Sequence, residues 1–119
     1  MNSDDLKKRT KEYSLKIIKF IDLLPNTISG RTIANQLIRS GTSVGANYRA
    51  SLRARSKIEF ISKLGIVIEE LDESLLWLEI INEGKLLNEL STKHLFNETN
   101  ELISIFITTK KSSIANLKS

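Results

Sequence analysis

The sequence predicts an all-α protein: one antiparallel up-down-up-down four-helix bundle that occupies residues 1–119 as a single domain. Three observations support this fold class. The 119 residues include only one proline and five glycines, so few positions interrupt a helix. Apolar residues recur at helical spacing in four long segments. The links between these segments are short, and short links place consecutive helices antiparallel to each other.

The first predicted helix covers about residues 3–24. Ser3 is its expected N-cap, because a serine side chain can accept a hydrogen bond from a free backbone N–H. Pro25 ends the helix, since the residue before a proline avoids helical dihedral angles. The apolar stripe of this helix contains Leu6, Tyr13, Ile17, Ile21 and Leu24.

The second predicted helix covers about residues 29–55 and contains the stretch SGTSVGANYR, from Ser40 to Arg49. A Walker phosphate loop needs four residues between its glycines and a Lys-Ser/Thr pair after them, and this stretch has neither. We therefore interpret it as helix, with a break near Gly41 as the alternative. Gly41 and Gly45 each cost about 1 kcal/mol in a helix interior, so we expect them to admit a closely packed backbone. Asn47 is expected to be a buried amide that bonds across helices, with a direct role in ligand binding as the alternative.

Two further helices are predicted at about residues 57–83 and 91–117. The third helix begins with a capping box in which Ser56 caps and Glu59 reaches back, and Gly84 is placed just past its end. The fourth helix carries lysines near its C-terminal end, where cations interact favourably with the helix dipole.

The net charge of +4 is distributed unevenly along the chain. Residues 25–57 contain six basic side chains and no acidic one, whereas residues 58–90 contain eight acidic side chains and two lysines. An acid-free basic run is typical of a phosphate-binding surface. The alternative is that its arginines pair with acids of the third helix, within the chain or in a neighbouring subunit. The candidate phosphate-contacting residues are Arg31, Arg39, Arg49, Arg53, Arg55 and Lys57, with Lys8 and Lys11 from the first helix.

The sequence contains no recognisable set of catalytic residues. The chain has no cysteine and a single histidine, His94, so no Cys/His or Ser/His/Asp set can be assembled. A ferritin-like metal site needs Glu-x-x-His pairs on two helices, and no glutamate lies three residues before His94. We therefore expect no enzyme activity, no catalytic residue, no metal and no cofactor. The sequence has no apolar run long enough for a membrane span and no secretory signal, so we expect a cytoplasmic protein.

The segment Gln36 to Ile81, QLIRSGTSVGANYRASLRARSKIEFISKLGIVIEELDESLLWLEII, resembles the four helix bundle protein family. These bacterial proteins were first noted as open reading frames in intervening sequences of 23S rRNA genes. Their pattern contains Gln-Leu-Arg-Arg, then Ser-Ile-Pro-Ala-Asn-Ile-x-Glu-Gly, then a basic run and Ser-x-x-Glu-Phe. The chain departs from it at Gly45, where proline is common, and at Ala50 and Ser51, where Glu-Gly is common. The matching positions are Gln36, Leu37, Arg39, Ser43, Val44, Ala46, Asn47, Ser56, Glu59 and Phe60.

The resemblance implies an antiparallel bundle that assembles as a ring-like homopentamer. Some family members are accessory proteins of diversity-generating retroelements, in which a basic bundle binds nucleic acid and the reverse transcriptase. The implied partners are therefore further copies of the chain, RNA or DNA, and a reverse transcriptase. The leading hypothesis is a non-enzymatic, oligomeric nucleic-acid-binding protein, and the alternative is a scaffold protein with no nucleic-acid role. The family motif and helix-packing residues are Gln36, Gly41, Ser43, Val44, Gly45, Ala46 and Asn47.

Overall fold

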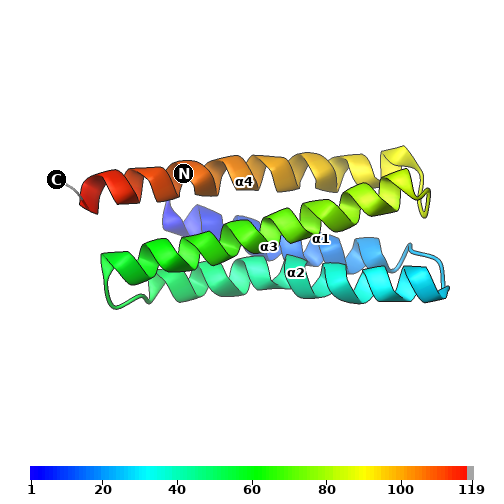
Figure 1. Ribbon diagram of the computed structural model, residues 1–119, viewed down its shortest axis with the longest axis horizontal. Helices are drawn as coiled ribbons and strands as arrows, with labels where there is room; N and C mark the ends of the chain where they lie inside the picture. Colours follow the sequence, from blue (N-terminus) through cyan, green and yellow to red (C-terminus); the bar gives the residue numbers. More distant parts are fainter. Residues whose placement is uncertain (118–119) are drawn as a thin grey trace.

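The computed structural model describes residues 1–117, which form four helices and no strand. The all-α helical bundle predicted from the sequence is therefore confirmed. The helices run along a common long axis in a body that measures 51 × 20 × 20 Å (Figure 1). Their bounds are Ser3–Ile21 for α1, Ile28–Leu52 for α2, Lys57–Glu83 for α3 and Glu89–Leu117 for α4.

The connections between the helices lie at alternate ends of the bundle (Figure 1). The α1–α2 and α3–α4 links share one end. The α2–α3 link lies at the other end, together with the beginning of α1 and the end of α4. Each helix packs along its length against the next one in the chain, whereas α1 and α4 approach each other closely at few positions.

The two ends of α1 differ from the prediction. Asn2, rather than Ser3, caps the helix: its Oδ1 accepts from the Asp5 N–H at 2.9 Å, and the Asp5 carboxylate accepts from the Asn2 N–H at 3.3 Å. This reciprocal capping box needs an acid three residues after the cap, and Asn2 meets that condition with Asp5. The helix ends at Ile21, because the following turn is tightened by a bond from the Leu23 N–H to the Phe20 carbonyl.

The ends of α3 are set by Ser56 and Lys85. Ser56 caps the helix by accepting from the Glu59 N–H at 3.1 Å, while the Glu59 carboxylate lies 3.6 Å from Arg55 Nε. Gly84 follows the helix directly, but it keeps helical dihedral angles, and the left-handed residue is Lys85, with φ of 58°. The Lys85 and Leu86 N–H groups bond back to carbonyls of the last turn, which is a Schellman motif.

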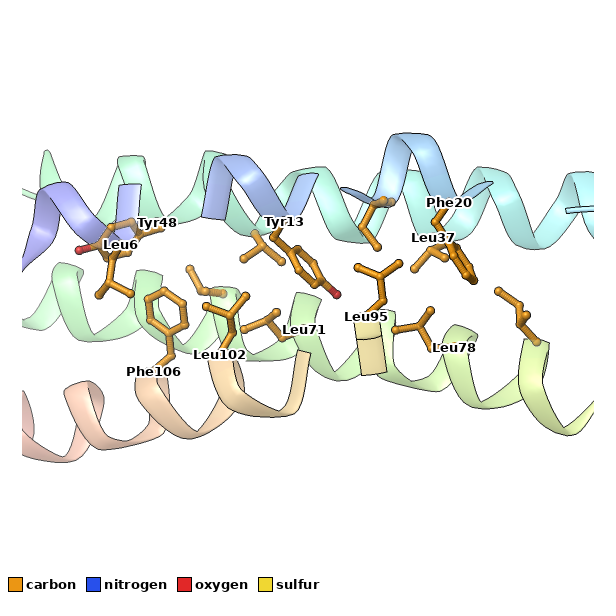
Figure 2. Close-up of a cluster of buried hydrophobic side chains, with 14 of the residues drawn as sticks. Leu6, Tyr13, Phe20, Leu37, Tyr48, Leu71, Leu78, Leu95, Leu102 and Phe106 are labelled. Carbon is orange, nitrogen blue, oxygen red and sulfur yellow. The ribbon is translucent and has the colours of Figure 1, made fainter. Parts of the chain in front are cut away.

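The core is formed by apolar side chains that point inward from all four helices (Figure 2). Burying each large side chain of this kind contributes about 1.5–3 kcal/mol to folding. The rings of Tyr48 and Phe106 pack against each other with centroids 5.3 Å apart, and so join α2 to α4 across the bundle. The other labelled core residues are Leu6, Tyr13, Phe20, Leu37, Leu71, Leu78, Leu95 and Leu102.

A set of buried hydroxyl groups also crosses the core, one from each helix. Tyr13 of α1 bonds Thr99 of α4 at 2.7 Å, and Ser40 of α2 bonds Ser74 of α3 at 2.8 Å. Burial raises the pKa of Tyr13 to about 12, against the opposing effect of the Thr99 and Ser74 hydroxyls. A buried hydroxyl without a partner costs about 1–3 kcal/mol, so this set favours the one axial alignment in which the four groups meet.

Candidate nucleic-acid interface

The helix that carries the basic run is continuous, because α2 passes through Gly41 and Gly45 without a break. The alternative of a break near Gly41 is therefore wrong. A Cβ atom at Gly41 would lie 2.9 Å from Ile17 Cγ1, and one at Gly45 would lie 3.5 Å from Thr10 Oγ1. The partner that comes close at both glycines is thus α1 of the same bundle.

The remaining residues of the family motif divide between the core and the surface. Asn47 Nδ2 donates to the carbonyl of Ser43 at 2.8 Å. The predicted bond across helices is therefore wrong, because the amide bonds one turn back in its own helix. Val44 is buried, Ala46 is exposed, and Gln36, Ser43 and Asn47 are partly buried.

Two of the eight candidate phosphate-contacting residues lie away from the others. Arg31 lies in the first turn of α2, at the end of the bundle that holds the α1–α2 link, and its Nη1 donates to Asn26 Oδ1 at 2.9 Å. Arg39 lies midway along α2, pairs with Glu73 of α3, and places Nη1 at 3.5 Å from Glu70 Oε2. The Arg39 guanidinium holds the pKa of Glu73 below its usual range. Arg39 thus follows the alternative in which these arginines pair with acids of the same chain.

The other six candidates share the end of the bundle where α1 and α3 begin and α2 and α4 end (Figure 1). We call this the basic end. The fold adds to it further basic residues, some from α3 and α4, that the sequence interpretation did not include. The basic residues in the adjoining helix turns and link are Lys7, Lys8, Arg9, Lys11, Arg49, Arg53, Arg55, Lys57, Lys63, Lys110 and Lys111, and the acidic residues there are Asp4, Asp5, Glu12, Glu59 and the two partners of Arg9, Glu98 and Glu101.

Most cations of the basic end, Arg49, Arg53 and Lys57 among them, have no carboxylate partner among the described side chains. Arg49, Arg53 and Lys57 are exposed, and none forms an ion pair with another described residue. The Arg55 side chain is 91% exposed, and its contact with Glu59 is of the kind that contributes little to stability in water. These charges therefore remain accessible to an external anion.

A groove of about 340 Å³ opens between α1 and α2 toward this end. Lys11 of α1 and Arg49 of α2 line it, together with the small side chains of Ser14, Thr42 and Ala46 and with Gly45. The groove therefore carries a cation from each of two helices. The stretch SGTSVGANYR, from Ser40 to Arg49, therefore forms one wall of the groove.

Arg9 has a structural role that the sequence did not indicate. Its Nε and Nη2 atoms donate to the two carboxylate oxygens of Glu98 at 3.1 and 2.8 Å, and Nη2 lies 2.9 Å from Glu101. Arg9 holds the pKa of Glu98 below its usual range, although burial opposes this effect. The pairing ties α1 to α4, and it cannot be read from sequence spacing because 89 residues separate the partners.

The described part of the chain offers little for a metal site or a membrane span. Among the residues whose side chains the structure describes, no three His, Asp or Glu side chains gather in a way that could hold a metal ion. In the same residues, no helix has an apolar stretch sufficient to cross a membrane. The lone histidine, His94, lines a groove between α1 and α4 near the end of the bundle opposite the basic end.

The comparisons with known proteins agree with this architecture. The model of the 23S rRNA-intervening sequence protein family matches residues 3–108. Among solved structures, the chain is similar to a protein of unknown function from the S23 ribosomal protein family from Bacteroides thetaiotaomicron VPI-5482. The identity is 29%, the match covers 93% of this chain and 99% of that chain, and the TM-score is 0.86. A comparison with curated proteins gives no match.

Proposed function

The chain belongs to the 23S rRNA-intervening sequence protein family, and from this membership and the charge distribution we propose that it is a non-enzymatic, nucleic-acid-binding accessory protein. The basic end contacts the backbone phosphates of RNA or DNA. One observation carries the proposal: Arg49, Arg53 and Lys57 are exposed, share one end of the bundle and form no ion pair with a described residue.

The separation of charge along the bundle supports this assignment. The part of α3 from Glu69 to Glu83 lies beyond the basic end and carries six acidic residues without any lysine or arginine. Arg39 of α2 pairs with two of these acids, and the other four repel a polyanion that the basic end attracts. Charge separated in this way steers encounter and fixes orientation.

The chemistry of the basic end favours phosphate contacts over recognition of bases. Single-stranded nucleic acid is commonly held by exposed aromatic rings on which bases stack. Tyr48 is the aromatic residue next to Arg49, and its ring is buried against Phe106. The proposed binding is therefore largely independent of sequence and weakens as salt is added.

Charge reversal at the two ends of the bundle tests the proposal. We expect the variant R49E/R53E to bind single-stranded RNA at least tenfold more weakly than the wild type at about 0.1 M salt. The matched control R31E/K93E makes the same change in net charge at the opposite end, and we expect it to bind within threefold of the wild type. The bundle is 51 Å long, whereas charges are screened over about 10 Å at 0.1 M salt.

Fluorescence anisotropy measures the affinities, and circular dichroism checks that every variant is folded. An equal loss of affinity in R49E/R53E and R31E/K93E would contradict a site at the basic end. Absence of binding by the wild type at low salt would overturn the nucleic-acid role itself.

The family resemblance supports a finer proposal about assembly. The bundle has the up-down-up-down order, acts in the cytoplasm and forms a ring-like homopentamer. In a retroelement context the ring also binds the reverse transcriptase. Exposed apolar side chains on α1 and α3, such as Leu15 and Leu76, support self-association, because 52% and 48% of their surfaces are exposed.

A scaffold protein without a nucleic-acid role is the second candidate. The pairing of Arg39 with Glu70 and Glu73 favours it, because it is one example of an arginine of the basic run satisfied by α3 acids. This candidate predicts that R49E/R53E dissociates the oligomer and that the wild type binds no RNA. Light scattering and anisotropy on the same samples separate the two functions.

A further inference from the structure

A second groove, of about 370 Å³, opens between α1 and α4 toward the end opposite the basic end. Phe20, Leu23 and Leu95 give it an apolar lining, and Leu23 is 59% exposed. Lys16, Lys19 and His94 also line it. The groove forms where α1 and α4 are not closely packed. Phe20 and Leu95 are only 5% and 3% exposed, so the apolar surface open to solvent is mainly that of Leu23, and basic groups border it.

The C-terminal half of α3 carries a surface of complementary chemistry, which we call the α3 ridge. Leu76 and Ile80 lie one turn apart and are 48% and 37% exposed. Glu79 and Glu83 lie on the same hollowed stretch of the helix. Among described residues, neither glutamate forms an ion pair. The ridge therefore has an apolar centre with acidic neighbours.

We propose that the α3 ridge of one copy of the chain packs into the α1–α4 groove of the next copy. Leu76 and Ile80 cover the apolar lining of the groove. Glu79 and Glu83 face Lys16 and Lys19. Lys16 and His94 lie near enough to Glu98 of their own chain to lower its pKa, whereas Lys19 has no carboxylate partner among the described side chains. The occupant is a second copy because the ridge of the same chain supplies exposed apolar side chains and unpaired acids that complement Leu23 and Lys19. Paired charges of this kind fix orientation and exclude wrong partners.

The positions of the two surfaces fit a closed ring. The groove is formed by the last turns of α1 and the first turns of α4, and the ridge by the last turns of α3, so both lie at one end of the bundle (Figure 1). They face different sides, because α3 packs against α2 and α4 but not against α1. The groove of one copy binds the ridge of the next, and both surfaces lie at the same level along the bundle. Successive copies are therefore related by a rotation about an axis parallel to the bundle. Such contacts form a ring when the successive rotations add up to a full turn.

This inference rests on the proposed self-association and not on nucleic-acid binding. It has one consequence for the proposed function. Copies related by rotation about a common axis point the same way, so all basic ends lie on one face of the ring. A single strand could then contact several copies, which raises the overall affinity without a new contact.

A charge-swap experiment tests the interface. The variants K19E and E79K each reverse one partner, and the double variant K19E/E79K restores the pair in exchanged form. The matched controls K93E and E69K reverse charges of the same sign outside the two surfaces. Light scattering coupled to size-exclusion chromatography gives the particle mass as a multiple of the 13.5 kDa chain, and circular dichroism checks folding.

We expect the wild type and both controls to be oligomeric. K19E and E79K should each raise the apparent dissociation constant at least tenfold, and the double variant should recover the wild-type mass. If the wild type is oligomeric and K19E and E79K have the same particle mass, this interface is wrong but self-association stands. A double variant that stays monomeric has the same consequence. A monomeric wild type overturns self-association as well, and RNA binding, measured separately, is unaffected by that result.

Discussion

At the scale of single residues, Gly41 and Gly45 look alike in the sequence but differ in the space around them. A methyl group at Gly41 would meet the buried side chain of Ile17 at 2.9 Å, whereas one at Gly45 would make an ordinary contact of 3.5 Å with Thr10. Alanine gains about 1 kcal/mol over glycine inside a helix. Overpacking costs typically about 1–3 kcal/mol.

We therefore predict opposite effects for the two substitutions. G41A should lower the free energy of unfolding by about 1 kcal/mol, because the clash with Ile17 outweighs the gain in helix propensity. G45A should raise it by about 0.5–1 kcal/mol. Urea denaturation measures both values. Effects of the same sign in the two variants would contradict the packing of α1 on α2 described above.

Lys85 gives a second prediction at this scale. It holds a left-handed conformation, with φ of 58°, at the position of the Schellman motif that glycine usually occupies. The left-handed region costs a residue with a Cβ atom about 1 kcal/mol, and glycine avoids this cost. K85G should raise the melting temperature by several degrees, whereas the control K93G, inside α4, should lower it. A lower melting temperature for K85G would contradict the assigned conformation.

The sequence predicted the cap of α3 but not the cap of α1 or the contact of Asn47. Ser56 was correctly expected to cap α3, because a serine before a helical pattern is a local signal. The expected role of Asn47 was wrong, because the choice between bonding a neighbouring helix and bonding its own depends on how the helix is rotated in the bundle. Sequence spacing alone does not determine that rotation.

At the scale of elements, α1 and α4 form the least closely packed pair of neighbouring helices, and charged groups join them. Arg9 holds the pKa of Glu98 below its usual range. A carboxyl group whose pKa is lower in the folded state stabilises the fold above its unfolded pKa, near about 4.3, and loses this contribution as pH falls through the folded pKa. The α1–α4 contact is therefore expected to weaken in acid.

E98Q tests this link. At pH 7 we expect the variant to lose about 1–2 kcal/mol of stability, because a partly buried, charge-assisted hydrogen bond is weakened. The difference from the wild type should begin to shrink as the pH falls below about 4.3, where unfolded Glu98 takes up a proton, and should vanish below the lower folded pKa, where Glu98 is neutral in both states. E101Q is the control: its carboxylate is 62% exposed, so its effect should stay below about 1 kcal/mol. An E98Q effect that is equal at pH 7 and pH 3 would contradict the ion-pair account.

The existence and type of the helices follow from local patterns, whereas their relative alignment does not. The apolar stripes predicted four helices because spacing of three and four residues places side chains on one face. The hydroxyl groups of Ser40, Ser74 and Thr99 appear in the sequence as ordinary polar residues. Their burial, and the bond between Thr99 and Tyr13, become evident only when the four helices are aligned.

At the scale of the whole molecule, folding separates the residues of the basic run, residues 25–57, in space. The run appears in the sequence as one continuous segment, but α2 distributes it along most of its length and leaves Arg31 and Arg39 away from the basic end. Folding also brings Lys63 and Lys110 to that end from α3 and α4. Charge counts along the sequence therefore predicted the kind of surface, and the packing of the helices determines its members.

The most direct test of the central claim is the salt dependence of RNA binding by the basic end. Fluorescence anisotropy with a single-stranded RNA, between about 50 and 200 mM salt, gives the slope of log affinity against log salt. We predict a steep negative slope for the wild type. For R49A/R53A, which removes two phosphate contacts, the slope should be about 1.4 smaller in magnitude. A wild-type affinity that does not change with salt, or a slope that is unchanged in R49A/R53A, would contradict the assignment of the basic end as the nucleic-acid interface.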